Sequence, residues 1–242
     1  MEPEAMGLEK VKALIFDTFG TVVDWRSSVI AEGEALGRAK GIERDWAAFA
    51  DAWRAGYRPA IEAIRAREAP WANAEQIHRV RLEEILAEFD ITGLTEAERA
   101  NLNRAWHRLA PWPDSVPGLT RLKRKFILAS FSNGTLGGLV KLAKHAGLPW
   151  DCILSADLLG HYKPDPETYL GAAAYLDLAP EEIMLVAAHN YDHRAAAVHG
   201  LRTAFVLRAR EYGPDQTSDL GAEGAWDIVT DSFTDLAERL GA

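Results

Sequence analysis

One apolar run decides the fold: Val11-Lys12-Ala13-Leu14-Ile15-Phe16-Asp17-Thr18-Phe19-Gly20-Thr21. Val11 to Phe16 has the length and apolar character of a strand buried on both faces, as in a parallel sheet, and turn-permissive Gly20 follows at once. An Asp directly after such a strand lies at the carboxyl edge of the sheet, where open α/β folds bind ligands. Because Asp is also a common turn residue, a capping role for Asp17 is the competing interpretation.

Length, charge and cysteine content limit the classes of function. The chain of 242 residues has room for one large domain or for a core with a smaller insert. Its formal charge of -9 argues against a general nucleic-acid or anionic-membrane surface, so we expect a small-molecule partner. The single cysteine, Cys152, cannot form an intramolecular disulfide. No apolar run is long enough to span a bilayer, and the start Met1-Glu2-Pro3-Glu4 lacks the pattern of a secretory signal, so we predict a cytoplasmic protein.

A block of helical patterns follows the first strand and contains no strand signal. Three prolines between Pro111 and Gly118 end this block and mark a return to another domain. We therefore predict an inserted helical domain over residues 23–110 that acts as a lid. Its four expected helices are Ser28–Ala39, Trp46–Arg67, Ala74–Phe89, and one that the capping box Thr95-Glu96-Ala97-Glu98 opens and that continues through Leu109.

Strand and helix patterns alternate from Leu119 to the end of the chain. Parallel strands need such crossovers, so the rhythm predicts an α/β core with a parallel sheet, formed by residues 1–22 and 111–242. The expected strands after the first are Phe126–Ser130, Cys152–Ala156, Ile183–Ala188, Arg202–Leu207 and Asp227–Val229, and the expected helices are Leu136–Ala146, Pro166–Leu176 and Ala195–His199.

Polar side chains follow four of the predicted strands or segments. If the strands are neighbours in one parallel sheet, these groups meet at its carboxyl edge. A solvated loop position is the alternative interpretation for Lys163, because lysines are mostly exposed. The four groups are Asp17, Ser132-Asn133-Gly134, Lys163-Pro164 and His189-Asn190-Tyr191-Asp192.

The order of these groups resembles the haloacid dehalogenase superfamily over essentially the whole chain. The resemblance implies a Rossmann-like core with a helical cap, and Asp17 as the nucleophile. Most members are magnesium-dependent phosphatases with a second Asp two residues after the nucleophile and an acidic pair in the last motif. Here Phe19 stands at the first of these positions, and Ala188 and His189 precede Asp192. A site short of carboxylates with Lys163 nearby should hold Mg²⁺ poorly, so we expect no metal and no organic cofactor.

The stretch Phe16-Asp17-Thr18-Phe19-Gly20-Thr21 looks like the motif of the L-2-haloacid dehalogenases, also called type II haloacid dehalogenases, in which the second residue after Asp is aromatic. The resemblance implies a hydrolase of carbon–halide bonds. It would convert short 2-haloalkanoic acids, L-2-haloacids and haloacetates, to 2-hydroxy acids through an ester on Asp17. Lys163 would keep Asp17 ionised, Asp192 would activate the hydrolytic water, and Thr21 would brace the nucleophile loop.

The resemblance also implies a substrate site. Arg54, in the cap segment Trp53-Arg54, and Asn133 would receive the departing halide, since N–H donors stabilise charge that develops as the bond breaks. Ser132 and the backbone amides near Thr18 and Phe19 would bind the substrate carboxylate. The remaining candidates are Tyr191 as a wall, Tyr169 six residues after Lys163, and His189 or Asn190 as polar contacts where related enzymes carry Ser and Asn.

Two alternatives to a dehalogenase remain open at this point. One is a phosphatase or phosphonate hydrolase of the same superfamily, against which Phe19 argues. The other is a catalytically idle member that binds a metabolite through the cap. The sequence also leaves a homodimer open.

Overall fold

The structure is a computed structural model that describes residues 7–242. The start Met1-Glu2-Pro3-Glu4, on which the absence of a secretory signal was predicted, lies outside the described residues. Within the described range, no helix is both long and apolar enough to cross a membrane.

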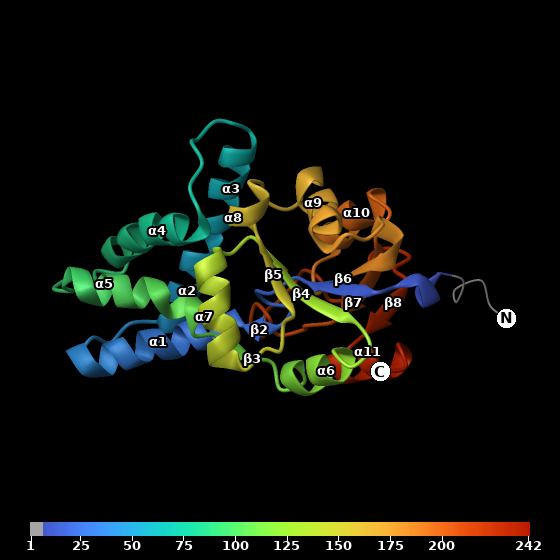
Figure 1. Cartoon of the computed structure of the whole chain (residues 1–242). Coiled ribbons are helices and arrows are strands. Elements are labelled where there is room, and N and C mark those ends of the chain that lie inside the picture. Colours follow the sequence, from blue (N-terminus) through green and yellow to red (C-terminus); the bar gives the residue numbers. More distant parts are fainter. Residues whose placement is uncertain (1–6) are drawn as a thin grey trace.

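A six-stranded parallel sheet lies at the centre of the molecule (Figure 1). Its strand order is β5-β4-β1-β6-β7-β8, and the α/β prediction is confirmed. β1 lies between β4 and β6, with Phe16 opposite Ser130 on one side and Val186 on the other. The four residues of β1 are fully buried, as the apolar run predicted. The strands are β1 (Ala13–Phe16), β4 (Ile127–Ser132), β5 (Cys152–Ser155), β6 (Ile183–Ala187), β7 (Arg202–Val206) and β8 (Ile228–Thr230).

Helices cover both faces of this sheet. Leu14 and Phe16 point to the face that packs against α6 (Ser115–Leu122), α7 (Leu136–Ala146) and α11 (Phe233–Arg239). Ala13 and Ile15 point to the opposite face, against α9 (Pro166–Leu176) and α10 (Asn190–Val198). Successive strand residues thus face opposite layers, and an apolar side chain is required at each of them. The core also contains the short elements η2 (Leu8–Lys10), α8 (Ala156–Leu159) and η4 (Pro180–Glu182).

The helical block lies beside the carboxyl edge of the sheet (Figure 1). A short antiparallel pair, β2 (Val23–Asp24) with β3 (Ala110–Pro111), closes it at both ends, close to the predicted limits. That residues 23–110 form a separate domain stays a prediction. The block contains α1 (Trp25–Lys40), α2 (Trp46–Ala55), α3 (Tyr57–Arg65), α4 (Ala74–Glu88), α5 (Glu96–Asn103) and η3 (Arg104–His107).

The predicted single helix from Trp46 to Arg67 is wrong, because α2 ends at Ala55 and α3 begins at Tyr57. A continuous helix would need an N–H at residue 59 to bond the carbonyl of Ala55, and Pro59 has none. Gly56 lies at the break, and the side chain of Arg81 packs where a Cβ would stand, 2.5 Å from Arg81 Cδ. The break divides the cap segment that carries Arg54 from the one that carries Arg65.

Three helices of the core were not predicted: the short α8, and α6 and α11. α6 begins inside the proline-rich stretch, where Pro117 lies in the first turn and so costs no internal hydrogen bond. α11 packs beside α6, and together they cover the sheet face that carries Phe16.

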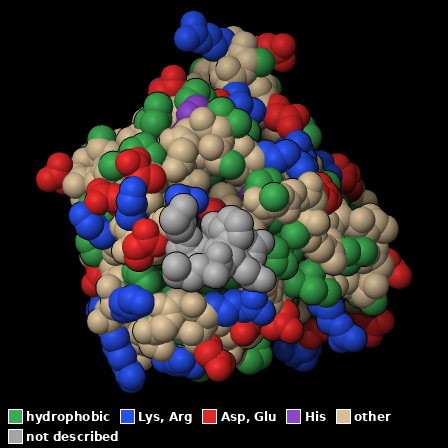
Figure 2. Space-filling model, turned by 90° about the vertical axis from the view of Figure 1, so that its right-hand side faces the viewer, with side chains coloured by type: hydrophobic (Ala, Val, Ile, Leu, Met, Phe, Trp, Pro, Cys, Tyr) green, Lys and Arg blue, Asp and Glu red, His purple; other side chains and the backbone are tan. Residues whose placement is uncertain are grey.

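The carboxyl terminus lies at the edge of the sheet opposite Asp17. Arg121 and Lys125, which precede β4, donate to the carbonyl oxygens of Ala242 and Leu240. On the face of the molecule in Figure 2, acidic and basic side chains are interspersed rather than gathered into one basic area. This agrees with the prediction from the net charge for that face.

Candidate active site

Asp17 lies directly after β1, at the carboxyl edge of the sheet, and only 6% of its surface is exposed. Lys163 Nζ donates to its Oδ1 at 2.8 Å, and Thr21 Oγ1 donates to its Oδ2 at 2.6 Å. Thr21 Oγ1 in turn accepts from the amide of Ala188 at 2.9 Å, which ties the nucleophile loop to the end of β6. The carboxylate is therefore held in one orientation by contacts on both oxygens.

Lys163 joins two carboxylates. Besides Asp17, its Nζ donates to Asp192 Oδ2 at 2.5 Å, while Tyr169 donates its phenol to Asp192 Oδ1. Asn133 fixes the backbone of Lys163, because its Oδ1 accepts from the amide of Lys163 at 2.8 Å. Lysine, tyrosine and both aspartates are buried, so the structure excludes the solvated loop position for Lys163.

Burial and charge act in opposite directions on these groups. Burial alone would raise the pKa of Asp17, but the charge of Lys163 and the contact with His189 hold it well below its ordinary value. Burial would lower the pKa of Lys163, yet the charges of Asp17 and Asp192 raise it. At neutral pH the site therefore holds an ionised carboxylate beside an ammonium group.

His189 connects Asp17 with an acid that the sequence analysis missed. Its Nδ1 lies 3.2 Å from Asp17 Oδ2, an ion-pair contact without the alignment of a hydrogen bond. Its Nε2 lies 2.9 and 3.1 Å from the two carboxylate oxygens of Glu211. Burial would lower the pKa of His189, but Glu211 and Asp17 together raise it well above its ordinary value.

Glu211 is buried and has a second donor, Trp25 Nε1, at 3.1 Å. It follows β7, and the strand pattern Arg202–Leu207 placed this segment at the same edge of the sheet. An acid in the segment after a predicted strand is the signal that could have identified Glu211 as a site residue. Four residues of irregular chain, 207–210, separate the strand from this acid, and they obscured the signal.

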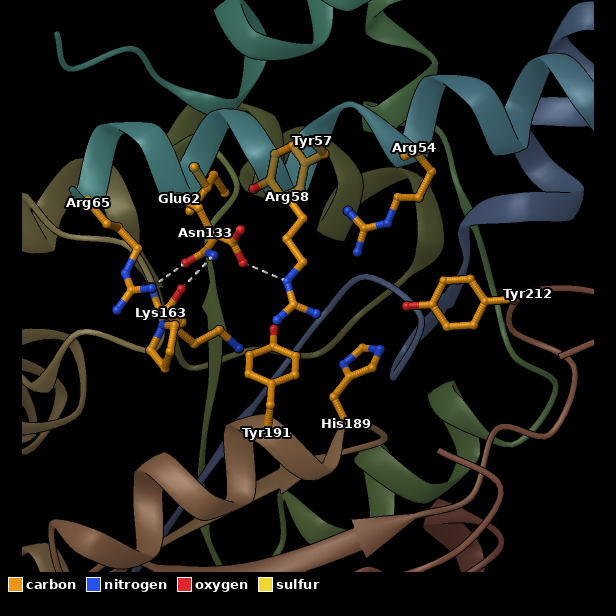
Figure 3. A pocket seen from close by; sticks show the side chains of 13 residues that line it. Arg54, Tyr57, Arg58, Glu62, Arg65, Asn133, Lys163, His189, Tyr191 and Tyr212 are labelled. Carbon is orange, nitrogen blue, oxygen red and sulfur yellow. Dashed lines mark hydrogen bonds and ion pairs between the residues drawn. The ribbon is translucent and has the colours of Figure 1, made fainter. Parts of the chain in front are cut away.

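A cavity of about 390 Å³ opens over these groups, between α2, α3 and the core. Figure 3 shows Arg54 and Arg58 reaching from the cap towards Tyr191 and His189. Lys163 and Asn133 lie at the same cavity. The cap and the sheet edge thus enclose one polar site.

Arg54 is the cation of this cavity that lacks an acid. Within residues 7–242 its guanidinium makes no hydrogen bond or ion pair with another side chain, and it lies over the rings of Tyr57 and Trp25, at 5.0 and 5.6 Å. The pKa of Arg54 is raised: burial acts to lower it, and the nearby tyrosines and Glu211 outweigh burial. A fixed cation beside aromatic faces suits a small anion.

The predicted carboxylate site has mixed support from the geometry. Within the described chain, the amides of Thr18 and Phe19 donate to no other residue, so both N–H groups are available to a ligand. Ser132, the last residue of β4, is buried, and its Oγ accepts from the amide of Gly134 at 3.2 Å. Its hydroxyl proton remains available for donation.

Three predicted contacts with substrate gain no support from the side chains. Thr18 Oγ1 faces Ser130 Oγ at 3.0 Å, and the ring of Phe19 packs against Trp106 at 6.2 Å. The side-chain amide of Asn190 instead binds the loop after β7. Its Nδ2 donates to Asp219 and Gly221, and its Oδ1 accepts from Glu223 and Trp226. Tyr191, by contrast, lines the cavity and is 38% exposed.

The donor set also bears on metal binding. Within residues 7–242, no three His, Cys, Asp or Glu side chains are grouped so that they could hold an ion. Lys163 Nζ lies between Asp17 and Asp192 and pairs with both carboxylates. A reaction without metal or organic cofactor stays a prediction.

Comparisons with known proteins agree with this geometry. The family described as haloacid dehalogenase-like hydrolase matches residues 11–200. The chain is 29% identical to an (S)-2-haloacid dehalogenase of Xanthobacter autotrophicus, over 82% of this chain and 76% of that protein. A solved L-2-haloacid dehalogenase is 48% identical with a TM-score of 0.93, covering 96% of this chain and 99% of that one. A solved defluorinating L-2-haloacid dehalogenase is 47% identical with a TM-score of 0.93, covering 96% of each chain.

Proposed function

Because the chain belongs to the haloacid dehalogenase-like hydrolases, we propose that it hydrolyses short L-2-haloacids and haloacetates to 2-hydroxy acids through an ester on Asp17. One observation carries the proposal: a buried, ionised Asp17 lies beside a cavity whose cation Arg54 has no acid partner among residues 7–242. A carboxylate held in this way is a nucleophile, and the free guanidinium is suited to a departing halide.

In the first step, a carboxylate oxygen of Asp17 forms a bond to the carbon that carries the halogen. The carbon–halogen bond breaks, and its electron pair leaves with the halide towards Arg54 and Asn133. The amides of Thr18 and Phe19, with Ser132, hold the substrate carboxylate in line with Asp17. A single displacement inverts the configuration at that carbon, and a halide needs no proton to leave.

In the second step, water attacks the carboxyl carbon of the Asp17 ester and releases the 2-hydroxy acid. The contacts of Asp192 favour a positioning role, because both of its oxygens are occupied by Lys163 and Tyr169. His189 is better placed as the base. Ester formation removes the charge of Asp17, one of the two anions that hold the proton on His189, so its pKa falls when a base is needed.

The alternatives are not favoured. A phosphatase of this superfamily needs an acid where Phe19 stands, and that ring is packed against Trp106. An idle binding protein would not need Asp17 kept ionised and in contact with Lys163, Thr21 and His189.

The test is halide release from each enantiomer of 2-chloropropionate, with EDTA present. We expect release from the L form, unchanged by EDTA, and loss of release in Asp17→Asn. A single turnover in H₂¹⁸O should place the label in the Asp17 carboxylate rather than in the product, because water attacks the ester carbon. Absence of halide from 2-chloropropionate, chloroacetate and fluoroacetate would refute the proposal.

We extend the proposal to the setting of the enzyme. The acidic net charge and the single cysteine support a cytoplasmic protein, and a homodimer stays a prediction that light scattering of the purified chain would test.

A further inference from the structure

Arg58 is an arginine at the cavity that the proposed reaction does not use. It lies on α3 and lines the cavity together with Arg54 on α2. Its guanidinium lies 6.0 Å from the ring centre of Tyr191, whose neighbour His189 contacts Asp17. Figure 3 shows it reaching down from the cap between Arg54 and Tyr191.

The three arginines of this cavity differ in their partners. Arg54 has no acid partner among the described residues, and Arg65 is tied to Asp165 at 2.6 Å in a contact that is 30% and 20% exposed. Arg58 pairs with Glu62 at 2.8 Å, and the two side chains are 79% and 53% exposed. An exposed pair four residues apart on a helix contributes only about 0.3–0.5 kcal/mol, so another carboxylate can replace Glu62 at little cost.

The cavity is also larger than a haloacetate requires, and three arginines line it. Its volume of about 390 Å³ extends past Arg54 to Arg58 and Tyr191. An alkyl group of the substrate would gain little binding free energy beside a guanidinium, because the guanidinium keeps its hydration. A second carboxylate would gain a charge-assisted and bidentate pair with Arg58.

We propose that this site takes L-2-halodicarboxylates of four carbons, such as 2-chlorosuccinate, and that Arg58 binds the distal carboxylate. The inference rests on the proposed function and names its substrate class. The carboxylate next to the halogen keeps its place at the amides of Thr18 and Phe19, and the halogen keeps its place at Arg54. The distal carboxylate then points along the cavity to Arg58 and displaces Glu62.

The chemistry is unchanged and balances. An oxygen of Asp17 bonds to carbon 2 of the substrate, and the carbon–chlorine pair leaves as chloride. Water then adds to the ester carbon and passes one proton to His189. As the ester bond breaks, His189 returns that proton to the leaving alkoxide to give 2-hydroxysuccinate, and the second proton of the water is released to solvent, which leaves the Asp17 carboxylate free.

The experiment compares kcat/KM for L-2-chlorosuccinate and L-2-chloropropionate in the parent and in Arg58→Met. We expect the ratio of the two values to fall by about 10- to 100-fold in the variant, the effect of removing a hydrogen bond between charged groups. The change should lie in KM for the dicarboxylate. Arg58→Lys should recover part of the ratio, and Glu62→Gln should raise it, since it frees the guanidinium.

Arg65→Met is the matched control, because it removes another cavity arginine that is already paired. It should leave the ratio near the parent value. A ratio unchanged in Arg58→Met, an equal fall in Arg65→Met, or chloride from 2-chloropropionate but none from 2-chlorosuccinate would overturn this inference alone. Absence of chloride from both substrates would instead overturn the proposed function and the inference with it.

Discussion

At the scale of single residues, the pair His189 and Glu211 is where this site differs from the set of residues predicted from the sequence. The histidine lies between the nucleophile Asp17 and the buried Glu211, with Nδ1 towards one and Nε2 towards the other. A base in this position acts on water that approaches the ester, whereas the displacement step needs only Asp17. The two chemical steps should therefore respond differently to its removal.

We predict that His189→Asn slows hydrolysis of the ester more than its formation. Loss of a general base typically costs 10²–10⁴-fold, so kcat should fall by about that factor. Rapid mixing should show a burst of halide equal to the enzyme concentration, and mass spectrometry should find the ester on Asp17. Glu211→Gln should give a smaller effect in the same direction. Equal loss of the burst and of the steady state would contradict this division of roles.

The second prediction concerns the charge of His189. Since Glu211 and Asp17 raise its pKa above the ordinary value of 6.5, titration by NMR should find it protonated at pH 6.5 in the parent. Its contribution to stability is full below that pH and is lost as the pH rises through the raised pKa. Asp17→Asn should lower the pKa. His78, whose pKa burial lowers, is the internal reference and should stay neutral, and a His189 pKa below 6.5 in the parent would refute the assignment.

Some residues of the site were predictable because they follow apolar runs that only a buried strand explains. Asp17 and Ser132 belong to this group. Lys163 was found by its place in the order of motifs, not by any local pattern. Glu211 was not predicted, because irregular chain separates it from β7. In such a segment no periodicity of apolar residues indicates where a side chain points. Asn190 was expected at the substrate because of its neighbours in sequence, but α10 begins there and turns its amide to the loop of Asp219.

At the scale of elements, Arg208 holds the nucleophile loop to the rest of the core. Its guanidinium donates to both oxygens of Asp114, before α6, and its Nε donates to the carbonyl of Thr21 at 2.9 Å. Asp114 also accepts from the amide of Phe233, where α11 begins. One ion pair therefore joins the β1 loop, α6, α11 and the segment after β7.

We predict that Arg208→Met destabilises the fold by about 3–5 kcal/mol in urea unfolding, the usual cost of leaving one charge of a buried pair alone. Burial raises the pKa of Asp114, and Arg208 outweighs it and lowers the pKa. The pair thus contributes fully above pH 3.8, and its contribution is lost as the pH falls through the lowered pKa. The variant lacks the pair, so this acid-dependent loss of stability should become smaller in it. The exposed pair Arg194–Glu223 is the control: Arg194→Met should change stability by under about 1 kcal/mol.

Element boundaries followed the sequence where one signal dominated. The predicted bounds Leu136–Ala146 and Pro166–Leu176 agree with the structure at both ends. There Thr135 and Asp165 precede the two helices, and Gly147 and Asp177 follow them in left-handed conformation. The break between α2 and α3 was missed because helical periodicity continues across it. There the missing N–H of Pro59 decided the outcome, not the pattern of apolar residues.

At the scale of the whole molecule, two contacts fasten the cap to the segment that carries Lys163. Arg65 on α3 pairs with Asp165, and Tyr162 donates to the carbonyl of Ala72 at 2.6 Å while its ring stacks on Trp71. In Figure 3, Arg65 lies at the end of the cavity away from Arg54. The two contacts join α3 and the segment that follows it to the core.

We predict that the double variant Arg65→Met with Tyr162→Phe loosens the cap without unfolding the sheet. Each lost contact contributes about 1 kcal/mol, so KM should rise several-fold for every substrate. Hydrogen exchange should become faster in Tyr57–Arg65 and in residues 66–73, and stay unchanged in β1 and β6. Faster exchange throughout the sheet would mean that these contacts support the whole fold instead.

The carboxyl-terminal residue lies behind the sheet, beside Arg121 and Lys125, while the substrate cavity opens at the other edge. The strand β4 alone separates the two by about 20 Å at roughly 3.3 Å per residue. If the chain were anchored to a resin or electrode through its last residue, the opening of the substrate cavity would therefore face the flowing solution. Immobilised this way, the catalyst should keep its turnover, whereas random coupling through surface lysines would vary its orientation.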